Sequence, residues 1–170
     1  LAGDEPTRFS VVRYGNVLGS RGSIVPLLRQ FVAEGRKSLP LTDERMTRFW
    51  ITLDQGIDFV LSSADLMRGG EIFVPKVPSM KIADMMEVIA PGIPHNVIGV
   101  RPGEKLHEVL MSEDDTATVL DFGDRYAICP THDARVQAYH EKNGATAIEQ
   151  GFRYASDTNT DWLSADDLRR

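Results

Sequence analysis

Residues 8–35 have the sequence RFSVVRYGNVLGSRGSIVPLLRQFVAEG, and this stretch decides the fold. Its beginning, residues 8–13, is short, rich in β-branched side chains and bounded by turn formers, which predicts a largely buried strand. Ser23 is a favourable N-cap for a helix that runs to Glu34 and stops at Gly35. The stretch is therefore expected to form a strand, a loop and a helix in that order.

Strands and helices are predicted to alternate along the following part of the chain as well. Strands are expected at 48–52, 71–74 and 96–100, and helices at 53–67 and 80–90. The first of these helices has an apolar face made of Ile57, Val60, Leu61 and Ala64. Ser79 is expected to cap the second helix. Such alternation indicates an α/β architecture in which strands pair in parallel.

Beyond Ser112 the alternation weakens. Residues 118–122 and 126–129 are expected to form a small hairpin, and the polar residues 131–150 a loop. A short final helix is predicted to open at residues 161–163. This last part therefore extends the α/β part without repeating its pattern.

The composition indicates a globular protein with one real core, since 42% of the 170 residues are hydrophobic. The longest apolar runs are far shorter than the about 20 residues of a membrane-spanning helix, so no membrane partner is expected. The single cysteine, Cys129, excludes an internal disulfide and fits a reducing compartment, which we take to be the cytoplasm. The first residues contain neither a basic leader nor an apolar signal core, and we interpret the sequence as cut from a longer chain.

The net charge of −6 argues against nucleic acid as a partner. The charge is unevenly distributed, because residues 1–52 contain eight Lys or Arg and only five Asp or Glu. A basic section within an acidic protein suits a small anionic ligand better than a polyanion.

The loop between the first predicted strand and helix has three glycines, at Gly15, Gly19 and Gly22. Glycines in such a loop allow backbone amides to approach a phosphate at a helix N-terminus. The spacing Gly-x-x-x-Gly-x-x-Gly differs from the Gly-x-Gly-x-x-Gly of a dinucleotide fingerprint. Three interpretations stay open: a plain turn capped by Ser23, a loop for a substrate phosphate, or a loop for a cofactor pyrophosphate. Ser20 and Arg21 are the candidate substrate contacts of this loop.

Residues 101–105 follow the strand predicted at 96–100, at the carboxyl edge where ligands bind open α/β sheets. Arg101 could hold a phosphate through its planar guanidinium, and Glu104 could accept hydrogen bonds from vicinal hydroxyls. The alternative is a local ion pair between Arg101 and Glu104. No metal site is expected, because no ligand spacing links the four histidines, His95, His107, His132 and His140.

Five runs together carry a resemblance to a known family: RYGNVLGSRGSIVP (13–26), LTDERMTRFWITLDQGIDFVL (41–61), GGEIFVPKVPSMKI (69–82), IGVRPGEKLHEVL (98–110) and GFRYASDTNTDWLS (151–164). They resemble the second half of the inverting UDP-N-acetylglucosamine 4,6-dehydratases of the pseudaminic acid pathway. Those enzymes are extended short-chain dehydrogenase/reductases. The resemblance covers nearly the whole chain and is weakest at about 131–150.

The resemblance implies a fold and a division of the chain. The fold would be the C-terminal part of a Rossmann-like extended short-chain dehydrogenase/reductase with a small substrate-binding subdomain. Residues 1–112 would form the end of an NADP-binding sheet interleaved with that subdomain. Residues 113–170 would form a C-terminal extension with a hairpin and a short helix.

The activity implied by the resemblance is NADP-dependent. The 4-hydroxyl of a UDP-sugar is oxidised, water is lost across the 5,6-bond, and the hydride returns to the 6-position with inversion at the 5-position. The product would be a UDP-4-keto-6-deoxy-hexose for a bacterial surface or flagellar glycan. The full-length protein would be a homo-oligomer. The alternatives are a related UDP-sugar dehydratase or epimerase of polysaccharide biosynthesis, and a nucleotide-sugar-binding module without catalysis.

The resemblance also implies roles for three residues of this sequence. Asn16 would touch the substrate next to the nicotinamide, and so contact the cofactor as well. Arg101 would bind the diphosphate or uridine, and Glu104 a ribose hydroxyl. The family's cofactor loop and its catalytic Asp, Lys and Tyr would lie upstream of Leu1, so no catalytic residue is expected in this chain. The four tyrosines agree, because none has a Lys four residues later.

Overall fold

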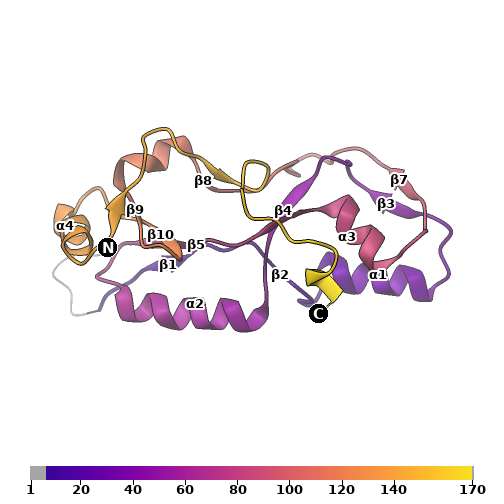
Figure 1. Cartoon of the computed structure of the whole chain (residues 1–170), viewed down its shortest axis with the longest axis horizontal. Helices are drawn as coiled ribbons and strands as arrows, with labels where there is room; N and C mark the ends of the chain where they lie inside the picture. Colours follow the sequence, from indigo (N-terminus) through magenta and orange to yellow (C-terminus); the bar gives the residue numbers. More distant parts are fainter. Residues whose placement is uncertain (1–6, 170) are drawn as a thin grey trace. The chain divides into compact units, whose positions relative to one another are not determined.

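Short strands and four α-helices make up the computed structural model, which describes residues 7–169 (Figure 1). The helices are α1 (Ile24–Ala33), α2 (Leu53–Leu66), α3 (Ile82–Ile89) and α4 (Ala134–Lys142), with 3₁₀ turns at η1 (Glu113–Thr118) and η2 (Asp167–Arg169). The first strands are β1 (Val11–Val12), β2 (Asn16–Val17), β3 (Leu39–Leu41), β4 (Thr47–Ile51), β5 (Ile72–Pro75) and β6 (Ser79–Lys81). The others are β7 (His95–Val97), β8 (Val109–Met111), β9 (Val119–Asp121), β10 (Arg125–Ile128), β11 (Thr146–Ala147) and β12 (Tyr154–Ala155).

The chain divides into two compact units, each assembled from segments that are distant in sequence. The first unit contains the residues up to Tyr14, Asp54–Lys76 and Val109–Tyr154. The second contains Gly15–Leu53, Val77–Glu108 and the residues from Ala155 onward. The division expected at 112/113 stays a prediction.

The first unit is built on a five-stranded sheet in the order β1-β5-β10-β9-β11. β1 pairs with β5 in parallel, whereas β10 pairs antiparallel with both β5 and β9, and β11 antiparallel with β9. The predicted hairpin is therefore confirmed as β9 and β10. The expectation of a largely buried first strand is wrong, because β1 lies at the edge of the sheet and Val11 is exposed.

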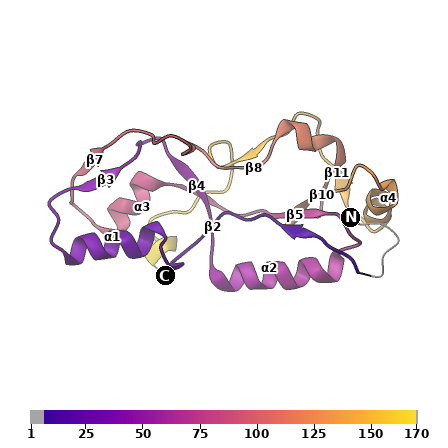
Figure 2. The same ribbon diagram turned by 180° about the vertical axis from the view of Figure 1, so that it is seen from behind.

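Helix α2 lies along this sheet in both views (Figures 1 and 2). Its buried side chains are those of Phe59 and Ser63, and Phe59 packs with Phe73 of β5 and Ala127 of β10. The expected apolar face is therefore not the buried one: its four members are exposed, namely Ile57, Val60, Leu61 and Ala64. The buried guanidinium of Arg125 donates to Ser62 and Ser63, so polar contacts as well as apolar ones orient this helix.

The second unit contains the three-stranded sheet β2-β4-β6 and the parallel pair β3 and β7. β2 and β4 are parallel, and β4 and β6 antiparallel. Helices α1 and α3 pack against each other and against β3 around one apolar core. The fully buried members at its centre include Leu28, Leu39, Leu41, Met85 and Met86. Parallel pairing is thus confirmed for three pairs of strands, within a mixed α/β fold.

Three further expectations are corrected. Ser79 does not cap a helix, because residues 79–81 pair with β4 and α3 begins only at Ile82. Residues 131–150 are not all loop, since α4 begins after Asp133, whose side chain accepts the backbone N–H of Arg135. Trp162 pairs with Ser79 in an isolated bridge rather than opening a helix, and the helical turn comes later, at η2.

In residues 7–169 no helix has the length and apolar character that a membrane crossing needs.

Candidate functional site

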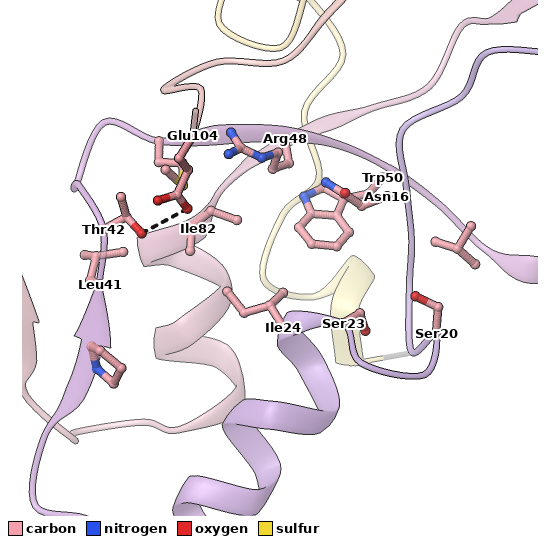
Figure 3. A pocket seen from close by; sticks show the side chains of 13 residues that line it. Asn16, Ser20, Ser23, Ile24, Leu41, Thr42, Arg48, Trp50, Ile82 and Glu104 are labelled. Carbon is pink, nitrogen blue, oxygen red and sulfur yellow. Dashed lines mark hydrogen bonds between the residues drawn. The ribbon is translucent and has the colours of Figure 1, made fainter. Parts of the chain in front are cut away.

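A cavity of about 240 Å³ lies within the second unit (Figure 3). Its polar lining consists of Asn16, Ser20, Ser23, Thr42, Arg48, Trp50 and Glu104. Its apolar lining includes Val17, Ile24, Leu41, Met46 and Ile82. The volume is smaller than the roughly 300–1,000 Å³ of typical small-molecule pockets. The cavity therefore suits one part of a larger ligand.

Strand β4 supplies the central wall of the cavity. Successive side chains of a strand point to opposite faces, so Arg48 and Trp50 share a face while Phe49 points away from it. Phe49 is accordingly buried in the core and absent from the cavity lining. Asn16 stands directly opposite Trp50 in the parallel register of β2 and β4. The pairing of β2 with β4 thus places the side-chain amide of Asn16 beside the indole of Trp50.

Gly15 allows β2 to approach β4 this closely. A Cβ at this position would lie 2.5 Å from Cβ of Phe49 and 2.6 Å from its carbonyl oxygen. The position of Asn16 therefore depends on the absence of a side chain at Gly15.

The glycine loop brings Ser20 and Ser23 to the cavity and leaves Arg21 exposed outside its lining. Gly19 and Gly22 have φ of 71° and 79°, which L side chains rarely adopt. Ser23 occupies the predicted N-cap position of α1, but its hydroxyl makes no capping hydrogen bond. The interpretation as a plain turn capped by Ser23 is therefore right about the position of the cap. It is wrong about the stabilising hydrogen bond, which the Ser23 side chain does not make.

Arg48 anchors the loop that carries Glu104. Its guanidinium donates to three backbone carbonyls, those of Thr47 at 2.7 Å, Leu106 at 3.1 Å and Lys105 at 2.7 Å. Burial lowers the pKa of Arg48, although an arginine stays protonated in proteins. Glu104 accepts a hydrogen bond from Thr42 Oγ1 at 3.3 Å. Arg48 is thus a half-buried positive charge, and it also anchors the loop that carries the Glu104 carboxylate.

Arg101 is exposed and is not part of the cavity lining. Its backbone N–H donates to Glu104 Oε2 at 3.4 Å, but the ion pairs of residues 7–169 include none between these two side chains. The alternative of a local ion pair is therefore not realised. The substrate role of Arg101 stays a prediction, as does that of Arg21.

The structure brings together three of the five predicted residues, Asn16, Ser20 and Glu104. The sequence analysis missed Arg48, Trp50 and Thr42 as site residues. The available signal was the alternation in β4, which puts a cationic and an aromatic side chain on one face. This alternation identifies Arg48 and Trp50 as site residues only when it is known which face of β4 lines the cavity.

The chemistry of this lining is that of recognition. Amide, hydroxyl, indole and guanidinium groups can hold phosphate or carbonyl oxygens, and the Glu104 carboxylate can hold hydroxyls. Among the described residues no group of His, Cys, Asp and Glu could hold a metal ion. For a nicotinamide cofactor, Asn16 is the lining residue whose amide can hydrogen-bond a carboxamide. The glycine spacing of the loop does not fit a dinucleotide pyrophosphate.

The family model described as polysaccharide biosynthesis protein matches residues 2–130. UDP-N-acetylglucosamine 4,6-dehydratase (inverting) of Campylobacter jejuni strain 81-176 is 49% identical over 99% of this chain and 52% of its own length. UDP-glucose 4-epimerase of Rickettsia canadensis is 40% identical over 72% of this chain and 37% of its own. The structure of Pen from Bacillus thuringiensis superposes with a TM-score of 0.79 at 31% identity, covering 95% of this chain and 47% of Pen.

The fold and these matches define the class as that of the extended short-chain dehydrogenase/reductases with a Rossmann-like α/β fold. Within that class, the chain belongs to the polysaccharide biosynthesis protein family. The expected fold and the resemblance are both confirmed. Enzymes of this class generally use a nicotinamide cofactor. The chain spans about half the length of the curated relatives it matches.

Proposed function

We propose that this chain is the substrate-binding half of an NADP-dependent UDP-N-acetylglucosamine 4,6-dehydratase that inverts the sugar at C5. The main observation behind the proposal is the cavity of the second unit, whose polar lining includes Asn16, Arg48 and Glu104. The sequence identity of 49% to an enzyme of that name supports the choice of substrate. The product would be a UDP-4-keto-6-deoxy-hexose for a bacterial surface glycan.

Polar groups of the cavity lining, together with the exposed Arg21 and Arg101, have parts in holding a UDP-sugar. Arg48 provides positive charge for the diphosphate, and Arg101 adds a guanidinium at the exposed side. Glu104 accepts the hydroxyls of the ribose, while Ser20 and Arg21 of the glycine loop offer further donors to the substrate. Asn16 lies where substrate and nicotinamide meet. Because the cavity is small, it holds only one part of the UDP-sugar and leaves the rest toward residues outside it.

The nicotinamide cofactor would take up and return the hydride of the sugar. The residues of this chain bind and orient the substrate for that transfer, and none of them is assigned a proton-moving role. The compartment that we propose is the cytoplasm. The whole protein is proposed to be a homo-oligomer with a UDP-sugar as its small-molecule partner.

A second candidate is a UDP-sugar epimerase, which the 40% identity to UDP-glucose 4-epimerase favours. The two activities differ in their products, because an epimerase returns a hexose that still has its 6-hydroxyl. A binding module without catalysis is a third interpretation. Incubating the full protein with UDP-N-acetylglucosamine and NADP, and analysing products by mass spectrometry, decides between them. Loss of 18 mass units supports the dehydratase. Where the mass is unchanged, proton NMR of the product separates the other two, because an altered sugar configuration supports the epimerase and an unaltered sugar supports the module.

The 170-residue chain alone is expected to form no keto-sugar, because it contains no tyrosine with a lysine four residues later. The measurement is the appearance of UDP-4-keto-6-deoxy-hexose from UDP-N-acetylglucosamine, with added NADP. The full protein serves as the positive control. Product formation by the chain alone would contradict the assignment of the catalytic groups to residues outside it.

Arg101→Ala is expected to weaken UDP binding by the full protein by roughly 1.5–3 kcal/mol, the usual scale for a hydrogen bond to a charged group. Arg101→Lys should recover only part of the loss, because lysine keeps the charge and loses the planar fork. Calorimetric titration with UDP measures the effect, and NADP affinity is the control that should not change. An unchanged UDP affinity in Arg101→Ala would remove Arg101 from the substrate site.

A further inference from the structure

Buried polar side-chain atoms without a hydrogen-bond partner are few in this protein. In the part of the chain that the structure describes there are three, Ser23 Oγ, Trp50 Nε1 and His95 Nε2. Two of them, those of Ser23 and Trp50, belong to residues that line the cavity. Unsatisfied buried groups cost free energy and call for an explanation such as a missing ligand. Their concentration at one cavity points to a ligand that completes their hydrogen bonds.

Trp50 is 2% exposed, and its indole projects from β4 among the side chains that line the cavity (Figure 3). The indole N–H is a donor only, so its partner must be an acceptor atom. The other tryptophan of the chain, Trp162, has a satisfied indole, because its Nε1–H donates to the carbonyl of Asn159 at 2.7 Å. The indole N–H of Trp162, where no ligand is expected, therefore has a partner within the protein. The indole N–H of Trp50, at the cavity, has none among the described residues.

The charge around the two groups selects the kind of acceptor. Ser23 immediately precedes α1, whose N-terminus carries a partial positive charge and whose first turn contains no acidic residue. The guanidinium of Arg48 lies on the same strand face as the indole. Phosphoryl oxygens are strong, negatively charged acceptors that suit both a helix N-terminus and an arginine.

We propose that the indole N–H of Trp50 and the hydroxyl of Ser23 are substrate-binding groups that donate to oxygens of the nucleotide diphosphate. The proposal rests on the proposed function, since it assumes that a UDP-sugar occupies the cavity. It adds two residues to the site and assigns Trp50 a recognition role besides its place in the core. Neither donor has a hydrogen-bond partner among the described residues, and the diphosphate would provide one.

The test is calorimetric titration of the full protein with UDP, uridine and inorganic pyrophosphate. Trp50→Phe keeps an aromatic ring and loses the N–H, and should weaken UDP binding roughly ten- to a hundredfold, the range for a hydrogen bond to a charged group. Uridine binding should be unchanged, because uridine has no phosphate. Trp162→Phe makes the same exchange at a satisfied indole and should leave UDP affinity unchanged. Ser23→Ala should weaken UDP binding in the same direction without lowering the thermal midpoint, since its hydroxyl makes no cap bond.

The outcomes separate this inference from the proposed function. If the wild type binds neither UDP nor UDP-N-acetylglucosamine, the proposed function fails and this inference fails with it. If the wild type binds UDP and both Trp50→Phe and Ser23→Ala bind it equally well, only this inference fails. Equal losses of UDP and uridine affinity would also overturn it, because they would show a contact to the nucleoside. Should Trp50→Phe not fold, Ser23→Ala decides alone: weaker binding of both UDP and inorganic pyrophosphate supports the inference, and unchanged affinity for both overturns it.

Discussion

Glu71→Ala is expected to lower the free energy of unfolding by about 3–5 kcal/mol, because it leaves several buried donors without their acceptor, at about 1–3 kcal/mol each. Glu71 is fully buried in the first unit, immediately before β5. Its carboxylate accepts hydrogen bonds from four groups: Ser10 Oγ at 2.7 Å, Arg68 N at 2.6 Å, Gly69 N at 2.8 Å and His140 Nε2 at 3.0 Å. Alanine leaves these donors buried without an acceptor. Urea unfolding of wild type and variant at pH 7 measures the loss.

The same carboxylate makes stability depend on pH. Burial alone would raise the pKa of Glu71, but the hydrogen bonds from His140, Ser10 and the backbone outweigh it and hold the pKa at about 2. Because the folded pKa lies below the ordinary value of 4.5, this stabilisation is fully present above about pH 4.5. It is lost as the pH falls through the interval between about 4.5 and about 2.

Glu71→Gln is the matched control for this prediction. It keeps the size and one acceptor oxygen of the side chain but cannot titrate. The stability of the wild type should fall more steeply than that of Glu71→Gln between pH 5 and pH 2, so the difference between them should shrink with acidification. Parallel curves for the two proteins over that interval would contradict the low pKa of Glu71.

Gly15→Ala is expected to destabilise the protein by about 3 kcal/mol, the upper part of the usual range for overpacking. The new Cβ would meet Cβ, O and C of Phe49 at 2.5, 2.6 and 2.9 Å, and most of these atoms are backbone that cannot move aside. β2 must therefore shift from β4, and Asn16, which pairs with Trp50 in that ladder, moves with it. We expect a lower thermal midpoint together with weaker UDP binding. Wild-type values of both quantities would show that the strands tolerate the extra atom.

Gly56→Ala is the control for the glycine substitution and should have the opposite sign. Gly56 lies within α2, and a Cβ there would meet nothing within 4 Å. Alanine is favoured over glycine in a helix interior by about 1 kcal/mol, so the variant should be more stable than the wild type by up to that amount. UDP affinity should stay the same, because Gly56 is not part of the cavity lining.

The functional assignment depends on tertiary geometry at a few positions. Asn16 and Glu104 are 88 residues apart in sequence. They meet at one cavity because β2 pairs with β4, and β4 supplies the arginine that anchors the loop after Glu104. Arg101 lies three residues from Glu104 and nevertheless is not part of the cavity lining. Proximity in sequence was therefore a poor guide to which side chains share the site.

The burial of α2 shows the limit of periodicity as a guide. The spacing of Ile57, Val60 and Leu61 predicts one apolar face, yet all three are exposed. The face that packs on the sheet is set by Phe59 and by Ser63, which meets the buried Arg125. Periodicity reports that a helix is amphipathic, whereas partners from β5 and β10 select the side that is buried.

Local chemistry in the sequence by itself determined most of the regular elements and the class of the protein. The cap position and glycine stop of α1, the length of α2 and the β9–β10 hairpin depend on neighbouring residues, and all three agree with the structure. The ordered motifs from residue 13 to residue 164 identified the family for the same reason. Only the tertiary structure decided that residues 79–81 form a strand, that β1 is an edge, and that Ser23 and Trp50 share a cavity with Asn16. Those features depend on hydrogen bonds and packing between segments far apart in the chain, and such contacts leave no periodic signal in either segment alone.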